Sequence, residues 1–262
     1  MPSGPPFRDA LSLRGPAGRI EGLLDMPTGI AVPAVAVICH PHPQHQGTQL
    51  NKVVHTISRS MNELGAPAIR FNFRGVGASE GAYADGLGEA EDVIAVAEWA
   101  RSRFPKNELW LAGFSFGAAV AIRAAEQLKP ARLISVAPPV ARMADLLAHV
   151  RPACPWLIVQ GMADEVVAAG DVQNWVQTRH PAARLVLLPD VGHFFHGKTL
   201  YGTAFPLAAS YYQGYRISLD QVFVCKGNGS AATTLRVGFP KQMDVELKRG
   251  AKIGLCPADA PL

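Results

Sequence analysis

The amino-acid sequence predicts an α/β domain, with a mainly parallel central sheet and helices on both faces, followed by a C-terminal extension of a different character. Short apolar runs bounded by turn residues alternate with segments of helical period through most of the chain, as in parallel sheets that are covered on both faces. The character of the sequence changes after about Lys198, and beyond Tyr211 it has runs in which apolar and polar residues alternate, which is typical of half-buried antiparallel strands. We therefore expect an α/β domain over residues 1–199 and a separate, β-rich extension over residues 200–262.

The first hundred residues hold three expected strands and two expected helices. The strands are Ile20–Met26, Ala34–Cys39 and Ala66–Phe73. From Asn51 to Leu64 the apolar residues fall on one helical stripe, and Gly65 is a suitable stop. A second helix is expected over about residues 88–104, because apolar residues recur there at helical spacing before Pro105.

The next hundred residues continue the alternation of strands and helices. Leu109–Ala112 is expected as a strand, Gly113–Gly117 as a sharp turn and Ala118–Leu128 as an Ala-rich helix. Three further strands are Arg132–Val136, Trp156–Gln160 and Arg184–Leu188, separated by helical stretches near residues 143–150 and 172–180. The alternating runs of the extension are Ile217–Val224, Thr233–Phe239 and Met243–Leu247.

Composition narrows the function class. The 262 residues are 48% apolar, which is enough for a large core, and the net charge of +4 is too slight for the concentrated basic face that phosphate binding needs. The N-terminus lacks a signal-peptide pattern, and no stretch reaches the roughly eighteen apolar residues of a membrane span. Four cysteines without a CxxC pair favour a reducing compartment, although a pair between Cys225 and Cys256 stays open. We expect a soluble, cytoplasmic protein that binds neither nucleic acid nor membrane.

Ser115 is a candidate nucleophile at the centre of a Gly-x-Ser-x-Gly pattern. A serine hydroxyl needs a base to take its proton and a position that a carbonyl carbon can reach. A tight turn between a strand and a helix provides that position, and Gly113 and Gly117 give the clearance that the adjoining backbones need. A purely structural turn is the alternative, but the apolar strand before it and the unbroken helix after it favour the nucleophile.

The acid of a serine-based site is expected between the serine and the histidine along the chain. Asp164 lies four residues after the strand that ends at Gln160, just beyond the edge of the sheet at which Ser115 is expected. Glu165 and Asp190 are the alternatives. Asp190 is disfavoured because it shares a short loop with the candidate histidine and would have to fold back on it.

The base is expected after the last strand of the domain. His193 lies five residues after the strand that ends at Leu188 and directly follows Gly192. His196, three residues further on, is its nearest rival, but His193 is closer to the strand end. The sequence therefore favours His193 as the base.

Several motifs together resemble a known family. They are Cys39–Pro43 with Gly47-Thr48, Asn51–Val54, Arg70–Gly81, Gly113–Gly117, Ala163–Val167 and Gly192–Gly197. Over about residues 8–199 the chain is similar to the small, bacterial-type α/β-hydrolases related to dienelactone hydrolases and carboxylesterases. The resemblance implies an α/β-hydrolase fold, a triad of Ser115, Asp164 and His193, and no cofactor. Members usually end with a helix soon after the histidine, whereas this chain continues for about sixty residues.

The segment His40–His45 invites two interpretations. In α/β-hydrolases the corresponding loop supplies a backbone N–H to the oxyanion, opposite the N–H of the residue after the nucleophile, here Phe116. Pro41 and Pro43 have no N–H, so His42 is the expected second donor. His40, His42 and His45 also have the spacing with which metallo-β-lactamase-like hydrolases hold zinc. Those proteins carry Asp where this chain has Gln44, and an amide is a weak zinc ligand, so we expect no metal.

The predicted function is that of a carboxylesterase-like serine hydrolase. It would cleave a small or medium acyl ester, thioester or lactone through an acyl-enzyme, with the acyl compound as its small-molecule partner. About nineteen residues, Pro138 to Trp156, separate the two strands between which such enzymes often insert a lid, so no large cap is expected. Two alternatives are a non-catalytic protein that keeps the fold for binding or as a scaffold, and a metal-dependent hydrolase.

Overall fold

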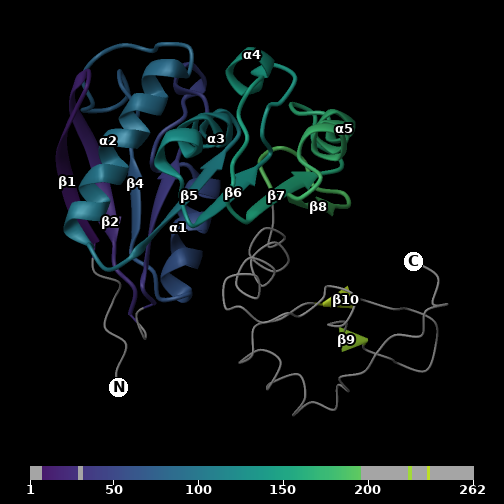
Figure 1. Ribbon diagram of the computed structural model, residues 1–262, viewed down its shortest axis with the longest axis horizontal. Coiled ribbons are helices and arrows are strands. Elements are labelled where there is room, and N and C mark those ends of the chain that lie inside the picture. Colours follow the sequence, from purple (N-terminus) through teal and green to yellow (C-terminus); the bar gives the residue numbers. More distant parts are fainter. Residues whose placement is uncertain (1–7, 29–31, 196–223, 226–234, 237–262) are drawn as a thin grey trace. The chain divides into compact units, whose positions relative to one another are not determined.

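The computed structural model describes residues 8–28, 32–195, 224–225 and 235–236 (Figure 1). The chain divides into two compact units, Met1–His196 and Gly197–Leu262. The described strands of the first unit form one eight-stranded sheet in the order β1-β2-β4-β3-β5-β6-β7-β8. In the second unit, two short strands, β9 (Val224–Cys225) and β10 (Leu235–Arg236), pair antiparallel.

Six neighbouring strands of the large sheet run parallel, from β4 to β8 in spatial order. The strands are β1 Arg8–Gly15, β2 Gly18–Asp25, β3 Ala34–Cys39, β4 Ala68–Phe71, β5 Glu108–Phe114, β6 Arg132–Val136, β7 Trp156–Gly161 and β8 Arg184–Leu188. Only β2 runs against its neighbours β1 and β4. The loops that follow β3, β4, β5, β7 and β8 therefore emerge at one edge of the sheet, which is where parallel α/β proteins place their sites.

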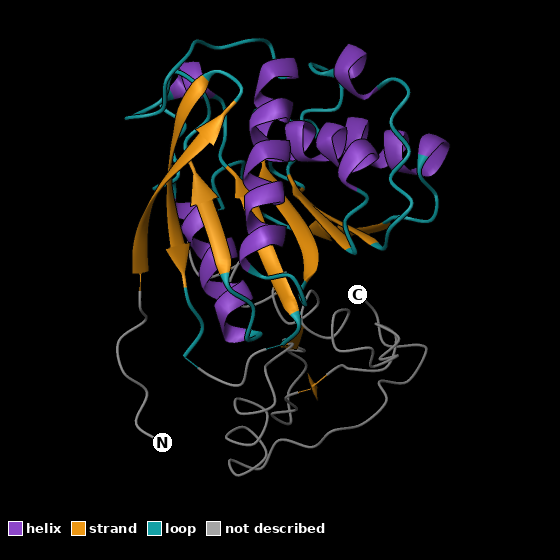
Figure 2. Ribbon diagram, turned by 60° about the vertical axis from the view of Figure 1, so that its left-hand side comes forward, coloured by secondary structure: helices purple, strands orange, loops and turns teal. Residues whose placement is uncertain are grey.

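Helices cover both faces of this sheet (Figure 2). They are α1 Lys52–Glu63, α2 Leu87–Arg103, α3 Phe116–Leu128, α4 Ala144–Leu147 and α5 Ala169–Arg179, with a 3-10 turn at Pro43–His45. Residues of α2, α3 and α5 share one apolar cluster with side chains of the strands, and the buried residues of α1 lie outside that cluster. One face is thus packed by α2, α3 and α5, and the opposite face by α1.

Local sequence patterns located most of the helices and strands of the first unit. Asn51 caps α1 by accepting backbone N–H groups of its first turn. Strands β3, β6 and β8 have the predicted bounds, and the helices begin and end within a few residues of the prediction except for α4, which is shorter. Strands β3 and β7 are buried on both faces, which gives the nearly continuous apolar runs that a sequence pattern can recognise.

Strand β1 is the element that the sequence analysis did not predict. It is an edge strand in which Leu13 is the one buried residue, so it lacks the continuous apolar run of the inner strands. It forms a hairpin with β2 that is closed by Gly15 and Gly18. Tertiary pairing with β2, rather than an apolar run, makes it a strand.

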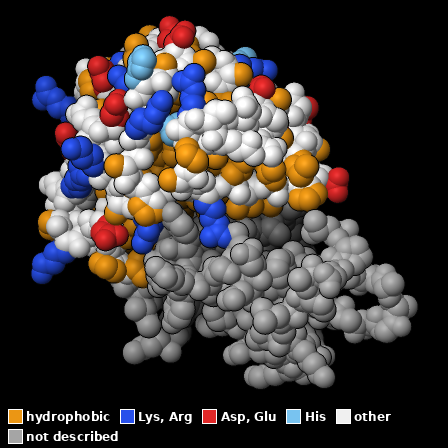
Figure 3. All heavy atoms as spheres, turned by 45° about the vertical axis from the view of Figure 1, so that its right-hand side comes forward, with side chains coloured by type: hydrophobic (Ala, Val, Ile, Leu, Met, Phe, Trp, Pro, Cys, Tyr) orange, Lys and Arg blue, Asp and Glu red, His pale blue; other side chains and the backbone are white. Residues whose placement is uncertain are grey.

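Most of the predicted extension lies outside the described residues. This includes the run Met243–Leu247, Cys256 and the greater part of the other two alternating runs. The expected boundary after residue 199 stays a prediction. On the face drawn in Figure 3, Lys and Arg side chains are interspersed with Asp and Glu side chains over the described surface. None of the described helices is long and apolar enough to cross a membrane.

Candidate active site

Ser115 stands at a strained turn between β5 and α3. Its φ of 53° and ψ of −123° lie outside the regions that serine ordinarily occupies. The backbone holds this conformation because the Ser115 N–H donates to the Val136 carbonyl at 2.8 Å. Such strain is concentrated at functional sites, where the surrounding structure can impose it. The serine is 9% exposed, at the edge of the sheet where the parallel strands end.

The two glycines of the turn are required by close backbone approach. A Cβ at Gly113 would collide with the backbone of Gly117. A Cβ at Gly117 would in turn collide with the carbonyl groups of Cys39 and His40 at the end of β3. The N-terminus of α3 therefore lies directly against the start of the segment His40–His45.

His193 reaches Ser115 from the loop that follows β8. Its Nε2 lies 3.1 Å from the Ser115 Oγ, and its Nδ1 lies 2.9 Å from one oxygen of the Asp164 carboxylate. The imidazole is 4% exposed and packs against the Phe114 ring, with centroids 5.0 Å apart. With the Asp164 carboxylate accepting the Nδ1 proton, Nε2 is left as the acceptor for the serine hydroxyl.

Asp164 is fixed by the loop that follows β7. Its side chain is fully buried, and one of its oxygens accepts the backbone N–H groups of Val166 at 2.9 Å and Val167 at 2.7 Å. The other oxygen accepts the Gln160 amide at 3.0 Å. Burial by itself would raise the pKa of this carboxyl, but the bonds from His193 and the two backbone groups hold the pKa below its usual value. Asp164 is therefore a carboxylate at neutral pH.

The structure separates the alternatives left by the sequence. Glu165 points to the backbone of the histidine loop, where its carboxylate accepts the His193 N–H at 3.2 Å. Asp190 lies in the turn after β8 with a φ of 56° and is exposed. The carboxylate bound to the His193 ring is that of Asp164. His196, the rival histidine, lies outside the described residues.

Phe116 and His42, the two expected oxyanion donors, lie next to each other. Phe116 is the first residue of α3, so its N–H has no partner within the helix. The rings of His42 and Phe116 are 4.8 Å apart between centroids. The loop that holds His42 and the helix that holds Phe116 thus meet at the end of β5, beside Ser115.

Known proteins resemble this chain in sequence and in fold. A model of the family described as serine aminopeptidase, S33 matches residues 32–152, a range that includes Ser115 and ends before Asp164. An uncharacterized protein of Rickettsia prowazekii is 34% identical over 194 residues, which cover 71% of this chain and 81% of the relative.

Two solved structures are similar over more than two thirds of the chain. An α/β serine hydrolase without a lid from Xanthomonas campestris is 45% identical with a TM-score of 0.70, covering 75% of this chain and 90% of that one. An α/β serine hydrolase homologue from Coxiella burnetii is 44% identical with a TM-score of 0.70, covering 72% of this chain and 91% of that one. The chain belongs to the α/β serine hydrolase family. The resemblance and the fold class inferred from the sequence are thereby confirmed.

In this hydrolase the His40 side chain stabilises the segment His40–His45. Its ring is fully buried, with Nδ1 2.6 Å from the Pro41 carbonyl and Nε2 accepting the Phe73 N–H at 3.0 Å. Burial lowers the pKa of His40 to about 4, so the ring is neutral. Because both ring nitrogens are engaged, a metal held by His40, His42 and His45 would have to break these bonds. No metal-ligand cluster occurs among the described residues of the hydrolase.

Two residues that support the site, Gln160 and Tyr83, were not singled out from the sequence, and a third, Glu165, was considered only as an alternative acid. Gln160 binds the Asp164 carboxylate, Glu165 binds the His193 backbone, and the Tyr83 hydroxyl lies 3.2 Å from the His42 Nε2. Gln160 had a detectable signal, because it is a polar residue next to the end of a fully buried strand. Tyr83 had none, because it lies in a loop whose residues lack any period.

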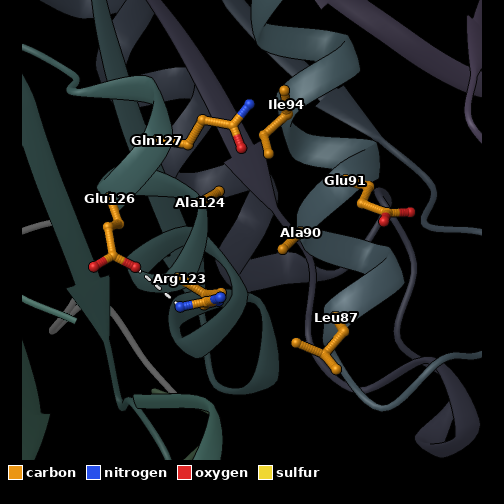
Figure 4. A pocket seen from close by; sticks show the side chains of 8 residues that line it. All are labelled: Leu87, Ala90, Glu91, Ile94, Arg123, Ala124, Glu126 and Gln127. Carbon is orange, nitrogen blue, oxygen red and sulfur yellow. Dashed lines mark hydrogen bonds and ion pairs between the residues drawn. The ribbon is translucent and has the colours of Figure 1, made fainter. Parts of the chain in front are cut away.

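A hollow of about 440 Å³ lies elsewhere on the hydrolase, between α2 and α3 (Figure 4). Its lining residues are Leu87, Ala90, Glu91 and Ile94 of α2 and Arg123, Ala124, Glu126 and Gln127 of α3. The lining includes both apolar and charged side chains, and Arg123 pairs with Glu126 at 2.9 Å. None of the residues bonded to Ser115 or His193 lines this hollow.

Proposed function

We propose that this hydrolase cleaves acyl esters of small or medium size, or the related thioesters or lactones, by the mechanism of a carboxylesterase. Ser115 is the nucleophile, His193 the general base and acid, and Asp164 the group that orients His193. The observation that carries the proposal is the chain of two hydrogen-bond distances, 3.1 Å from Ser115 Oγ to His193 Nε2 and 2.9 Å from His193 Nδ1 to Asp164. These are the geometric roles of a nucleophile, a base and an orienting acid.

The first half of the reaction forms an acyl-enzyme. The Ser115 oxygen attacks the carbonyl carbon while its proton passes to His193 Nε2, and the carbonyl oxygen becomes an oxyanion. The backbone N–H groups of Phe116 and His42 bind that oxyanion, aided by the positive end of α3. The tetrahedral intermediate then collapses, and the leaving alcohol or thiol takes the proton from His193.

The second half of the reaction restores the enzyme. A water molecule attacks the acyl carbon as its proton passes to His193 Nε2, and the C–O bond to Ser115 breaks as the serine oxygen takes that proton back. The buried Asp164 carboxylate stabilises the imidazolium that forms in each half. A carboxylic acid leaves, and no cofactor is consumed.

The preference for small or medium substrates rests on the connection between β6 and β7. This connection contains only α4, a helix of four residues, in the place where a lid would be inserted. The similar Xanthomonas campestris protein is described as a serine hydrolase without a lid. A site without a cap gives little apolar surface to a long acyl chain, so short acyl groups should be the better substrates.

A p-nitrophenyl ester panel tests the proposal. The wild-type chain should hydrolyse p-nitrophenyl acetate and butyrate faster than the palmitate, and a fluorophosphonate probe should label it. Ser115→Ala should abolish both signals with circular dichroism unchanged, whereas Ser135→Ala, at a buried serine in β6, should leave the labelling intact. Equal rates for wild type and Ser115→Ala would overturn the proposal.

A chelator arm separates the metal-dependent alternative. Activity of the wild-type chain should be the same with and without EDTA, because Ser115 chemistry needs no ion. Activity lost to EDTA and restored by zinc would replace the serine mechanism. A chain that folds but neither hydrolyses any ester nor reacts with the probe would favour the scaffold alternative.

A further inference from the structure

The His42 side chain forms two hydrogen bonds, which are separate from the backbone N–H that is proposed to bind the oxyanion. Its Nδ1 accepts the Gln44 N–H at 3.2 Å. A ring nitrogen that accepts from an N–H carries no proton, so the proton of the neutral ring is on Nε2. Nε2–H therefore donates to the Tyr83 oxygen, 3.2 Å away. These two bonds fix the tautomer of His42 and the orientation of its ring.

Tyr83 is itself held firmly. Burial, followed by the nearby negative charges of Asp85 and Glu89, raises the pKa of its hydroxyl, which therefore keeps its proton. The backbone on either side of Asp85 is tied to Glu89, a fully buried residue at the start of α2. One Glu89 oxygen accepts the Ala84 N–H at 2.9 Å and the other accepts the Gly86 N–H at 2.8 Å. The loop after β4 thus presents Tyr83 from a rigid base.

The beginning of the same loop is anchored to α2 as well. Arg74 makes an ion pair with Asp92 at 2.8 Å, and its backbone N–H donates to the other oxygen of that carboxylate at 3.0 Å. Asp92 is fully buried. Both ends of the loop from Arg74 to Gly86 are therefore fixed to one helix, and Tyr83 shares its rigidity.

Ring contacts also connect Tyr83 to Phe116, the residue that follows the proposed nucleophile. The Tyr83 ring lies 5.1 Å from that of His42 and 5.8 Å from that of Phe116, measured between centroids. His42 and Phe116 are the two residues whose backbone N–H groups are proposed to bind the oxyanion. Tyr83 is thus in contact with the side chains of both.

We propose that Tyr83 is a positioning residue of the oxyanion site, which acts by holding the His42 ring and thereby the direction of the His42 backbone N–H. The inference rests on the proposed function of Ser115, Phe116 and His42. An oxyanion site stabilises the transition state only when its donors are already aimed at the developing charge. Because residues 41 and 43 are prolines, His42 has the one backbone N–H in the segment 41–43. If its peptide rotates, no adjacent N–H can take its place as the oxyanion donor.

The test removes only the hydroxyl. Tyr83→Phe keeps both ring contacts and loses the bond to His42. It should lower kcat for p-nitrophenyl acetate by about three- to ten-fold with KM unchanged, because an oxyanion donor acts in the transition state and a lost neutral hydrogen bond has this size. The rate at which a fluorophosphonate labels Ser115 should fall by a similar factor, and the thermal midpoint should stay within a few degrees of wild type.

A double-mutant cycle shows whether Tyr83 acts through His42. His42→Ala removes the ring and keeps the backbone N–H, and it should lower kcat by itself. In the His42→Ala background, Tyr83→Phe should have no further effect on kcat, since the partner of the hydroxyl is gone. Equal losses in both backgrounds would overturn the inference.

The remaining outcomes separate the inference from the proposed function. Hydrolysis and labelling that depend on Ser115 but are unaffected by Tyr83→Phe would overturn the role of Tyr83 alone. A rise in KM with kcat unchanged would also overturn it, because Tyr83 would then bind the substrate directly. Hydrolysis that does not depend on Ser115 would overturn the proposed function and this inference with it.

Discussion

His40 and His193 are two buried histidines at the same edge of the sheet, and they differ in the partners of their ring nitrogens. His40 is tied on both sides to backbone groups, those of Pro41 and Phe73. His193 lies between the Asp164 carboxylate and the Ser115 hydroxyl. The exposed fractions of the two residues, 0% and 4%, do not distinguish them.

The difference shows that hydrogen-bond partners, and not burial, decide what a histidine can do. A ring held by two backbone groups is not stabilised by a second proton. Protonation of its acceptor nitrogen would break the hydrogen bond which that nitrogen accepts from a backbone N–H. A ring held by a carboxylate can take a proton from a hydroxyl, because the carboxylate stabilises the imidazolium. We therefore expect changes at His193 to affect activity and changes at His40 to affect folding.

The largest effect is expected from His193→Gln. The substitution keeps most of the side-chain volume and removes the proposed base, so kcat/KM for p-nitrophenyl acetate should fall on the order of 10⁴-fold or more. Stopped assays with wild type and Ser115→Ala as references give the measurement. Residual activity within ten-fold of wild type would remove the distinction between the two histidines.

Asp164→Asn should reduce activity nearly as much. The amide can turn its NH₂ toward His193 and favour the tautomer with the proton on the wrong nitrogen, so kcat should fall by about 10²- to 10⁴-fold. The pH dependence of kcat should be measured with it, together with Glu165→Gln as the neighbouring control. A loss at Glu165→Gln that equals the loss at Asp164→Asn would mean that the acid has been assigned to the wrong residue.

His40→Gln should show the opposite pattern. Without the ring, the buried Phe73 N–H loses its acceptor, which should lower the free energy of unfolding by about 2–4 kcal/mol. Activity per folded molecule should fall far less than in His193→Gln. Urea unfolding and active-site titration with a fluorophosphonate measure the two quantities separately, and a stable but inactive variant would break the comparison.

Mild acid should destabilise the protein through its buried neutral histidines. The pKa of His40 and that of His180, which packs against Trp156 and Trp175, are both lowered to about 4. The unfolded chain takes up these protons near pH 6.5 and the folded chain only near pH 4. Stability is therefore present above pH 6.5 and falls as the pH drops toward 4, by up to about 1.4 kcal/mol per pH unit for each histidine.

Urea unfolding of the full chain at pH 7, 6 and 5 measures this loss. His180→Phe, which keeps an aromatic ring and cannot be protonated, should show a flatter dependence than wild type over that interval. A free energy of unfolding that stays constant from pH 7 to pH 5 would contradict the prediction.

The smallest effect is expected from Glu165, which touches His193 only through the backbone. Glu165→Ala removes the acceptor of the His193 backbone N–H. It should lower kcat by about three-fold, because the loop that contains His193 loses one of its hydrogen bonds. Glu165→Gln should restore wild-type activity, since an amide oxygen can accept the same bond. No recovery in Glu165→Gln would show that the charge, and not the bond, matters.

The sequence by itself determined most of the elements and the order of the candidate site. Helical and strand periods located the buried strands and the helices of the first unit, because burial on both faces leaves a continuous apolar run. The Gly-x-Ser-x-Gly pattern marked the turn at Ser115, because the two glycines answer to a local requirement, the clearance of adjoining backbones. Local requirements of this kind are written into neighbouring residues.

Only the tertiary structure decided which carboxylate binds the His193 ring and which groups His40 and Tyr83 contact. Ser115 and His193 are 78 positions apart, and they meet because parallel strands bring their following loops to one edge. Asp164 and Glu165 are adjacent in sequence, yet one binds the ring and the other the backbone of the same residue. A residue's role at such an edge depends on the side chains that other loops place beside it, and no local pattern encodes these long-range contacts.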